Sequence, residues 1–205
     1  MVAGPVVSAY QRCMTGSAVI VSVLGLAACA SVACKGGARA EGLAAWSDVY
    51  SVLISPRCLN CHTATSFPEQ GDDRHRHFAN VTRGPDGRGV PGLTCGGCHQ
   101  HTNADATGVP GGPDWHLAPL SMQWQDTGGR ALASADVCRA VTDRSNNNGL
   151  DANGLLRHHT QDALVLWAFR PGVRAGGTPR SVPPLSHDAF VRATRRWAEA
   201  GTPCP

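Results

Sequence analysis

Two five-residue stretches of this chain share a frame in which two cysteines and a histidine have the same spacing. The first is CLNCH at Cys58–His62 and the second is CGGCH at Cys95–His99. Thiols and imidazoles bind metal ions, and closely spaced thiols also form redox-active disulfides or covalent attachments. The frame therefore predicts one of three kinds of chemistry: a metal ligand set, a redox dithiol or a pair of cofactor anchors.

The histidine that follows the second cysteine separates these alternatives. A zinc site built from paired CxxC turns has no need of it. A thioredoxin-like dithiol is expected once, after a strand of an α/β pattern that this sequence lacks. In CxxCH, two thiols can form thioethers with the vinyl groups of one haem, which places the next imidazole under the iron. We therefore expect two covalently attached c-type haems, and zinc or structural disulfides remain the alternatives.

CLNCH and CGGCH, together with an export-type N-terminal segment, give the sequence its resemblance to a known family. It resembles the multihaem c-type cytochromes, in particular small exported dihaem electron-transfer proteins. The resemblance implies that Cys58 and Cys61 hold one haem, with His62 as the proximal iron ligand. For the second haem the matching residues are Cys95, Cys98 and His99. Single-haem domains in tandem would need more chain between the motifs, so we expect both haems to share one domain.

The residue opposite each proximal histidine decides whether an iron passes electrons or reacts with a substrate, because two strong ligands leave no open position. Met122, in the stretch WHLAPLSMQW, is the only methionine beyond the N-terminal segment. We expect it to bind one iron, although methionine also commonly fills gaps in packing. For the other iron the candidates are His159, on the apolar face of an expected helix, and His77, in the loop between the motifs. A haem with a His/Met pair would have a higher potential than one with a His/His pair.

The remaining histidines are weaker candidates because of their positions. Beyond the motifs they are His75, His101, His116, His158 and His187. His158 is expected on the polar side of its helix beside Asp162, and His116 competes with Met122 for one site.

The first forty residues have the features of an export leader. Arg12 precedes the apolar run Ala18–Ala33, which is long enough for a signal-peptide core and too short for a confident membrane span. LAAC, ending at Cys29, fits a lipobox that would leave this cysteine lipidated, whereas ARA at Ala38–Ala40 fits an ordinary signal peptidase. We therefore expect a leader at 1–40 and a periplasmic dihaem domain at 41–205, either free or tethered to a membrane.

The charge of the expected mature chain argues against nucleic-acid binding. The formal charge of +3 falls to zero without Arg12, Lys35 and Arg39, because fifteen arginines then balance fifteen acidic residues. Lys35 is the only lysine, which excludes a lysine-rich docking face. Cys138 and Cys204 remain after the leader and the motifs are set aside, and in an oxidising compartment they predict a disulfide rather than two free thiols.

From Glu41 onward, 19 glycines and 13 prolines interrupt the chain, so regular elements alone cannot bury a large core. Apolar spacing predicts helices at 43–54, 134–141, 154–169 and 186–200. We expect a mainly α fold with extensive loops and little or no β-sheet, wrapped around two haems that fill its interior. The stretch DRSNNNGLDANG misses the calcium-loop frame and predicts a turn followed by a helix start.

These observations favour a periplasmic carrier that moves single electrons between transiently bound redox partner proteins. The main alternative is a small haem enzyme, of the peroxidase or nitrogen-oxide reductase type, in which one iron keeps an open position. Its pocket would be lined by one of Arg74, Arg76, Arg83 and His116. A gas-binding sensor and a zinc-stabilised interaction module are further alternatives.

Overall fold

The computed structural model describes residues 26–205, with side chains from residue 36 on. The chain divides into two compact units, Met1–Ala40 and Glu41–Pro205. The boundary falls where the sequence predicts the end of the leader, whose cleavage and lipidation stay predictions. Arg12 and the first part of the apolar run lie outside the described residues, as does the side chain of Cys29. No helix of the described residues is both long and apolar enough to cross a membrane.

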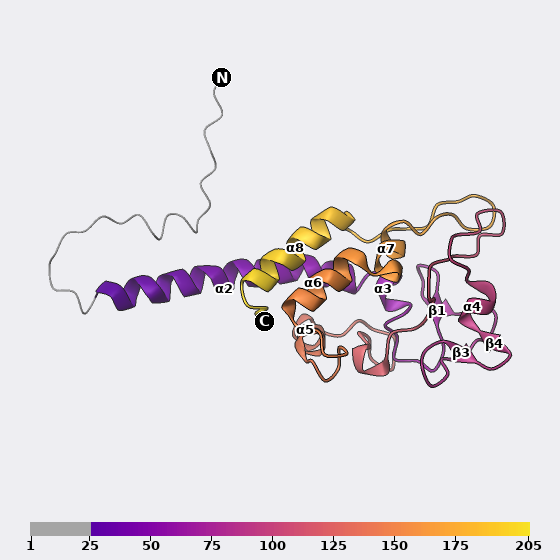
Figure 1. Cartoon of the computed structure of the whole chain (residues 1–205), viewed down its shortest axis with the longest axis horizontal. Helices are drawn as coiled ribbons and strands as arrows, with labels where there is room; N and C mark the ends of the chain where they lie inside the picture. Colours follow the sequence, from indigo (N-terminus) through magenta and orange to yellow (C-terminus); the bar gives the residue numbers. More distant parts are fainter. Residues whose placement is uncertain (1–25) are drawn as a thin grey trace, which may run out of the picture. The chain divides into compact units, whose positions relative to one another are not determined.

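The second unit is mainly helical with long loops, as the sequence predicts. The described helices are α2 (Leu26–Leu53), α3 (Pro56–Leu59), α4 (Cys95–Cys98), α5 (Ser134–Thr142), α6 (Ala152–Gln161), α7 (Ala163–Phe169), α8 (His187–Glu199) and the 3₁₀ turn η1 (Leu120–Met122). The only strands in the described part of the chain form two antiparallel hairpins. These are β1 (Glu69–Gln70) with β2 (His75–Arg76) and β3 (Gly89–Val90) with β4 (Leu93–Thr94). In Figure 1, α5, α6 and α8 gather near the end of α2, while the hairpins and α4 lie at the opposite end of this unit.

The C-terminal ends of the predicted helices agree with the structure to within one residue, but the helix predicted from Leu43 begins earlier, at Leu26. α2 ends at Leu53, before Pro56, and Ser186 caps α8 by accepting a hydrogen bond from the backbone N–H of Ala189. The helix predicted at 154–169 is instead two helices. Asp162 adopts an extended backbone after α6 and accepts hydrogen bonds from the first turn of α7, so this cap breaks the helix.

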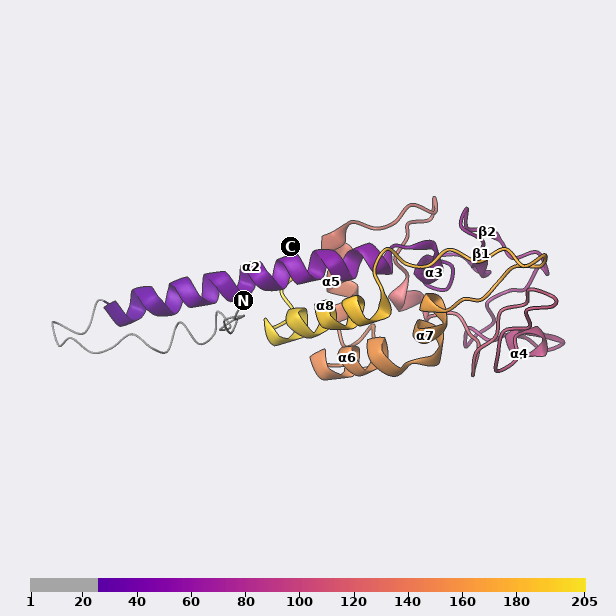
Figure 2. The ribbon, with the colours of Figure 1, turned by 90° about the horizontal axis from the view of Figure 1, so that it is seen from above.

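The helical end of the unit is closed by two tryptophans. The rings of Trp46 in α2 and Trp197 in α8 lie 4.9 Å apart and are almost completely buried, and Figure 2 shows these helices side by side. Gly42 allows this approach, because a Cβ there would lie 2.6 Å from Ala200 Cβ. Trp46 Nε1 also donates to Ser134 Oγ, which fixes the start of α5.

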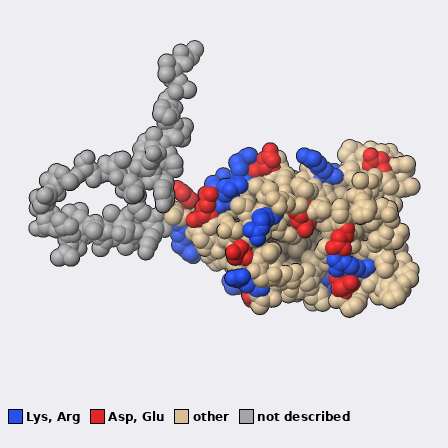
Figure 3. Space-filling view, viewed as in Figure 1, with Lys and Arg blue, Asp and Glu red and all other residues tan. Residues whose placement is uncertain are grey.

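The loop end is held together by the buried Arg83 and the half-buried Arg180 instead of regular elements. Arg83 donates through its guanidinium to three backbone carbonyls, those of Thr63, Thr65 and Ala118. Arg180 likewise donates to the carbonyls of Pro171, Val173 and Gly108. Each guanidinium therefore ties together chain segments that no sheet or helix connects. On the face shown in Figure 3, charges of both signs are interspersed.

The predicted disulfide between Cys138 and Cys204 is confirmed. It joins the buried side of α5 to the C-terminus and closes a loop with a sequence separation of 66 residues.

We predict that replacing both cysteines, as in Cys138→Ala with Cys204→Ala, lowers the free energy of unfolding by about 2–4 kcal/mol, because the unfolded chain regains the entropy of this loop. Urea unfolding of the purified protein measures the change. The wild type with added reductant should approach the variant. Equal stability of the two proteins without reductant would contradict the prediction.

Candidate functional site

Each CxxCH motif forms a single tight turn that brings its histidine back over its first cysteine. The turns contain α3 and α4, and in both the histidine N–H donates to the carbonyl of the first cysteine at 2.9 Å. Pro56 at the first position of α3 favours the start of that turn. Two segments that are far apart in sequence thus present two thiols and one imidazole in the same local form.

The two motif histidines also share their surroundings. His62 Nδ1 donates to the Met122 carbonyl at 2.7 Å, and His99 Nδ1 donates to the Pro110 carbonyl at 2.8 Å. Because a carbonyl can only accept, the proton of each neutral ring is placed on Nδ1 and the lone pair of Nε2 is left free. This is the tautomer that a metal ligand needs.

One short segment, Trp115–Trp124, serves both histidines. The ring of Trp124 stacks on His62 with centroids 3.5 Å apart, and the ring of Trp115 stacks on His99 at 4.5 Å. Both pairs are within 5° of parallel. The backbone N–H of Trp124 also donates to the backbone carbonyl of His62. The segment therefore orients both imidazoles.

The thiols of the two motifs are free, and the pKa values of three of them are raised. Cys58, Cys61, Cys95 and Cys98 form no disulfide. Burial raises the pKa of Cys58 to about 11 and that of Cys61 to about 12, the latter raised further by the nearby Cys58 and Cys95. A redox dithiol needs a thiolate with a lowered pKa, so the raised pKa values of Cys58 and Cys61 do not suit thioredoxin-like chemistry at the first motif.

Two adjoining cavities open beside the motifs. The His99 cavity, of about 470 Å³, is lined by Cys95, Cys98 and His99 and by side chains such as Phe78 and Leu117. The His62 cavity, of about 380 Å³, is lined by Cys58, Cys61 and His62 and by largely apolar residues of α2, α6 and α7. Five residues line both cavities: Arg57, Cys61, Trp115, His116 and Trp167. The cavities therefore share a wall.

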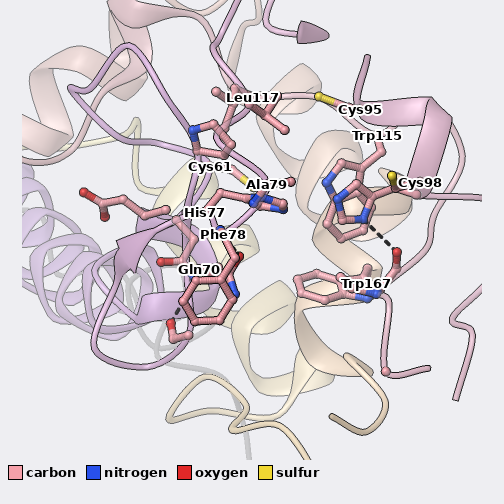
Figure 4. Close-up of a pocket in the computed structure, with 18 of the residues that line it drawn as sticks. Cys61, Gln70, His77, Phe78, Ala79, Cys95, Cys98, Trp115, Leu117 and Trp167 are labelled. Carbon is pink, nitrogen blue, oxygen red and sulfur yellow. Dashed lines mark hydrogen bonds between the residues drawn. The ribbon is translucent and has the colours of Figure 1, made fainter. Parts of the chain in front are cut away.

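His77 lies across the His99 cavity from the second motif (Figure 4). Its ring centroid is 6.0 Å from that of His99, with an angle of 70° between the planes. Two imidazoles that bind one metal ion through Nε2 at about 2 Å have centroids about 6 Å apart, so the spacing fits a shared iron. His77 Nδ1 accepts a hydrogen bond from the Ala79 N–H at 3.2 Å. Iron binding through Nε2 would move the ring proton to Nδ1 and break this bond.

The His62 cavity contains the other predicted ligands, but in different positions. Met122 accepts the hydrogen bond of His62 through its carbonyl, which places its backbone on the side of His62 that faces away from Nε2. His159 is 4% exposed, stacks on Phe190 and bonds through Nδ1 to Thr194 Oγ1 at 2.9 Å. The structure thus brings both residues to the cavity without showing either of them bound to a metal.

His158 is a further histidine that lines the His62 cavity. Its side chain is 39% exposed, and its Nδ1 lies 3.5 Å from Asp162 Oδ2. Burial lowers the pKa of His62 to about 4, and the nearby His158 lowers it further. Asp162 follows His158 by four residues, so the two side chains are neighbours as the sequence predicts.

Among the other residues singled out in the sequence, His75 lines the His99 cavity, whereas the three arginines and His187 line neither cavity. Arg74 donates to Gln125 Oε1, and Arg76 lies 4.6 Å over the ring of Phe67. His75 bonds to Asp73, and His187 donates to the backbone carbonyl of His159 at the start of α8. Arg83 makes its hydrogen bonds in the described part of the chain to backbone carbonyls, so its role there is structural.

The donor set fits haem better than a bare metal ion. Among the described residues, no three His, Cys, Asp or Glu side chains are grouped so that they could hold a metal ion. A porphyrin supplies four ligands of its iron, so the protein needs to provide only one or two imidazoles. Two buried donors, Trp124 Nε1 and Arg57 Nε, have no partner in the described part of the chain, and both residues line the His62 cavity. A prosthetic group with carboxylates could satisfy such donors.

Comparison with known proteins adds no family: no family model, curated protein or solved structure matches this chain.

Burial of His159 predicts a pH dependence of stability. Burial lowers the pKa of His159 to about 3 from its ordinary value, so the unfolded chain binds a proton that the folded chain excludes. Stability should therefore fall as the pH drops below the unfolded value of about 6.5, and it should keep falling toward pH 3.

We predict that His159→Gln reduces this dependence by up to about 1.4 kcal/mol per pH unit. Urea unfolding at pH 6.5, 5.5 and 4.5 measures it, and the exposed His101→Gln serves as the control. An identical pH slope in wild type and His159→Gln would show that His159 does not carry the effect.

Proposed function

We propose that this chain is an exported electron-transfer protein that carries two covalently attached c-type haems and passes single electrons between redox partner proteins. When bound, each haem would supply an iron that changes its charge by one electron. The observation that carries the proposal is the duplicated arrangement at Cys58–His62 and Cys95–His99. In both, free thiols, a neutral imidazole with free Nε2 and a stacked tryptophan face a largely apolar cavity.

The chain's own residues supply attachment and shielding. Thiols that stay protonated can add across the vinyl groups of a haem to form thioethers, and the fixed turn then holds the imidazole at the iron. Hydrogen bonds from Nδ1 to carbonyls raise the basicity of each ring and fix its orientation. The tryptophan stacks exclude water from the protected face of each ring.

For the second iron we propose His99 and His77 as the two protein ligands. The 6.0 Å spacing of their centroids supports this pair. For the first iron we propose His62 and, on the opposite side, His158 in preference to Met122 or His159. Partial exposure toward the cavity and the neighbouring Asp162 support His158, since a carboxylate commonly orients a metal-bound histidine. Two strong ligands on each iron favour electron transfer over substrate chemistry.

The shared wall of the cavities supports transfer between the two irons. Cys95 is close enough to Cys61 to raise its pKa, although the two residues are 34 positions apart in sequence. Trp115, His116 and Trp167 complete the wall. A protein that places two redox groups on either side of one wall can accept an electron at one and release it at the other.

We predict that the protein, exported from a host with haem-maturation machinery, has the mass of its polypeptide plus two haems. Cys58→Ala with Cys61→Ala should remove one haem, and Cys95→Ala with Cys98→Ala should remove the other. Mass spectrometry of the denatured protein measures the number attached. A wild-type protein without covalent haem, or one that contains zinc instead, would overturn the proposal.

We also predict that both irons are low-spin, and that His77→Ala and His158→Ala each convert one of them to a high-spin form that binds carbon monoxide or cyanide. Visible and electron paramagnetic resonance spectra measure this. Met122→Ala and His159→Ala should keep two low-spin irons, and His101→Ala is the matched control.

A red sulfur-to-iron band that is lost in Met122→Ala would instead assign that position to methionine. A high-spin iron in the wild type would favour the enzyme alternative.

A further inference from the structure

Arg57 is a buried cation on the wall between the two cavities. It is 5% exposed and lines both the His62 cavity and the His99 cavity. Its Nη2 donates to Asp72 Oδ1 at 2.5 Å, but its Nε is buried without a hydrogen-bond partner in the described part of the chain. A buried N–H that lacks an acceptor is strongly unfavourable, so Arg57 is missing an acceptor that the described polypeptide does not provide.

Asp72 fixes the position of this arginine. Its carboxylate accepts from Arg57, from Arg174 Nη2 at 2.6 Å and from Ser181 Oγ at 2.6 Å. Arg174 also lines the His99 cavity, as does Arg180. Three guanidinium groups therefore approach one cavity, and the carboxylate of Asp72 bonds to only two of them. Glu69 also lines this cavity, so the three guanidinium groups face two carboxylates. The local charge is still positive, which suits an anionic group in the cavity.

A haem carries two carboxylates in addition to the vinyl groups that the thiols take. The planar guanidinium binds carboxylates with two parallel N–H donors, and a carboxylate enclosed in protein needs such a partner. We infer that Arg57 binds a haem carboxylate at the boundary of the two cavities, and that Asp72 is a positioning residue that holds Arg57 there. This inference rests on the proposed function.

The position of Arg57 has an electrical consequence. A fixed positive charge close to an iron favours the reduced form, which carries one positive charge less. Because Arg57 lines both cavities, its charge acts on both irons. Removal of this charge lowers both reduction potentials, whereas removal of the negative charge of Asp72 raises them. If the pair of Arg57 and Asp72 only supported the fold, loss of either residue would not be expected to shift the potentials in opposite directions.

The test is redox-difference infrared spectroscopy of the exported holoprotein with ¹³C in the haem carboxylates, together with potentiometric titration of both haems. In Arg57→Gln the labelled carboxylate bands shift and both potentials fall. Arg57→Lys keeps the positive charge but loses the two parallel N–H donors of the guanidinium. The labelled carboxylate bands therefore shift, while both potentials stay nearer to those of the wild type. Asp72→Asn raises the potentials.

The matched control is Arg130→Gln, which removes the same charge from an exposed residue that bonds to Asp126. Its bands and potentials should equal those of the wild type. If Arg57→Gln fails to fold, Arg57→Lys alone decides the question through the bands. Attached haem with labelled bands unchanged in both Arg57 variants overturns this inference and leaves the proposed function intact. Absence of covalent haem in the wild type overturns both.

Discussion

The guanidinium of Arg83 is the interaction on which the arrangement of the loop end depends. It is buried without a carboxylate, and it is satisfied by three carbonyls that belong to segments remote in sequence. Hydrogen bonds from a charged donor contribute more to stability than neutral ones. One side chain can therefore connect segments that no β-sheet joins. Thr63 directly follows the first motif, and Ala118 lies within Trp115–Trp124. The bond network therefore holds that segment against His62.

From this connection the orientation of both motif histidines follows. The same ten residues contribute Trp115 to one ring, and Trp124 and the Met122 carbonyl to the other. A displacement of the segment would disturb both sites together. The two halves of the candidate site are thus mechanically coupled, which suits a protein in which two groups must keep a constant separation.

The two ends of the second unit have different sources of stability. At the helical end, Trp46 and Trp197 belong to a contiguous apolar core, and the disulfide at Cys138 fastens the C-terminus to it. The His62 cavity opens among α2, α6 and α7, and the His99 cavity lies at the loop end. Buried polar groups line both cavities. Burial raises the pKa values of Cys58 and Cys61 and lowers that of His62, so these two thiols stay protonated and this imidazole stays neutral. An apolar ring system in these cavities would supply packing that the loops themselves do not have.

The sequence by itself determined the features that depend on neighbouring residues. The CxxCH frames, the cap at Ser186, the stop of α2 before Pro56 and the mainly helical class with long loops are all local, because turns, caps and periodicity act over a few residues. The Cys138–Cys204 pairing could also be predicted, because only two cysteines remained once the others had been assigned.

Only the tertiary structure decided what faces each motif. The cap at Asp162 competes with helix continuation and divides the predicted helix in two. His158 and the buried His159, both in α6, line the His62 cavity. The carbonyl of Met122, rather than its thioether, meets His62, since the turn η1 aims the backbone at the imidazole. Arg57 had no sequence signal at all. The role proposed for Arg57 depends on its position in the wall between the two cavities. That wall forms only when segments far apart in the chain come together.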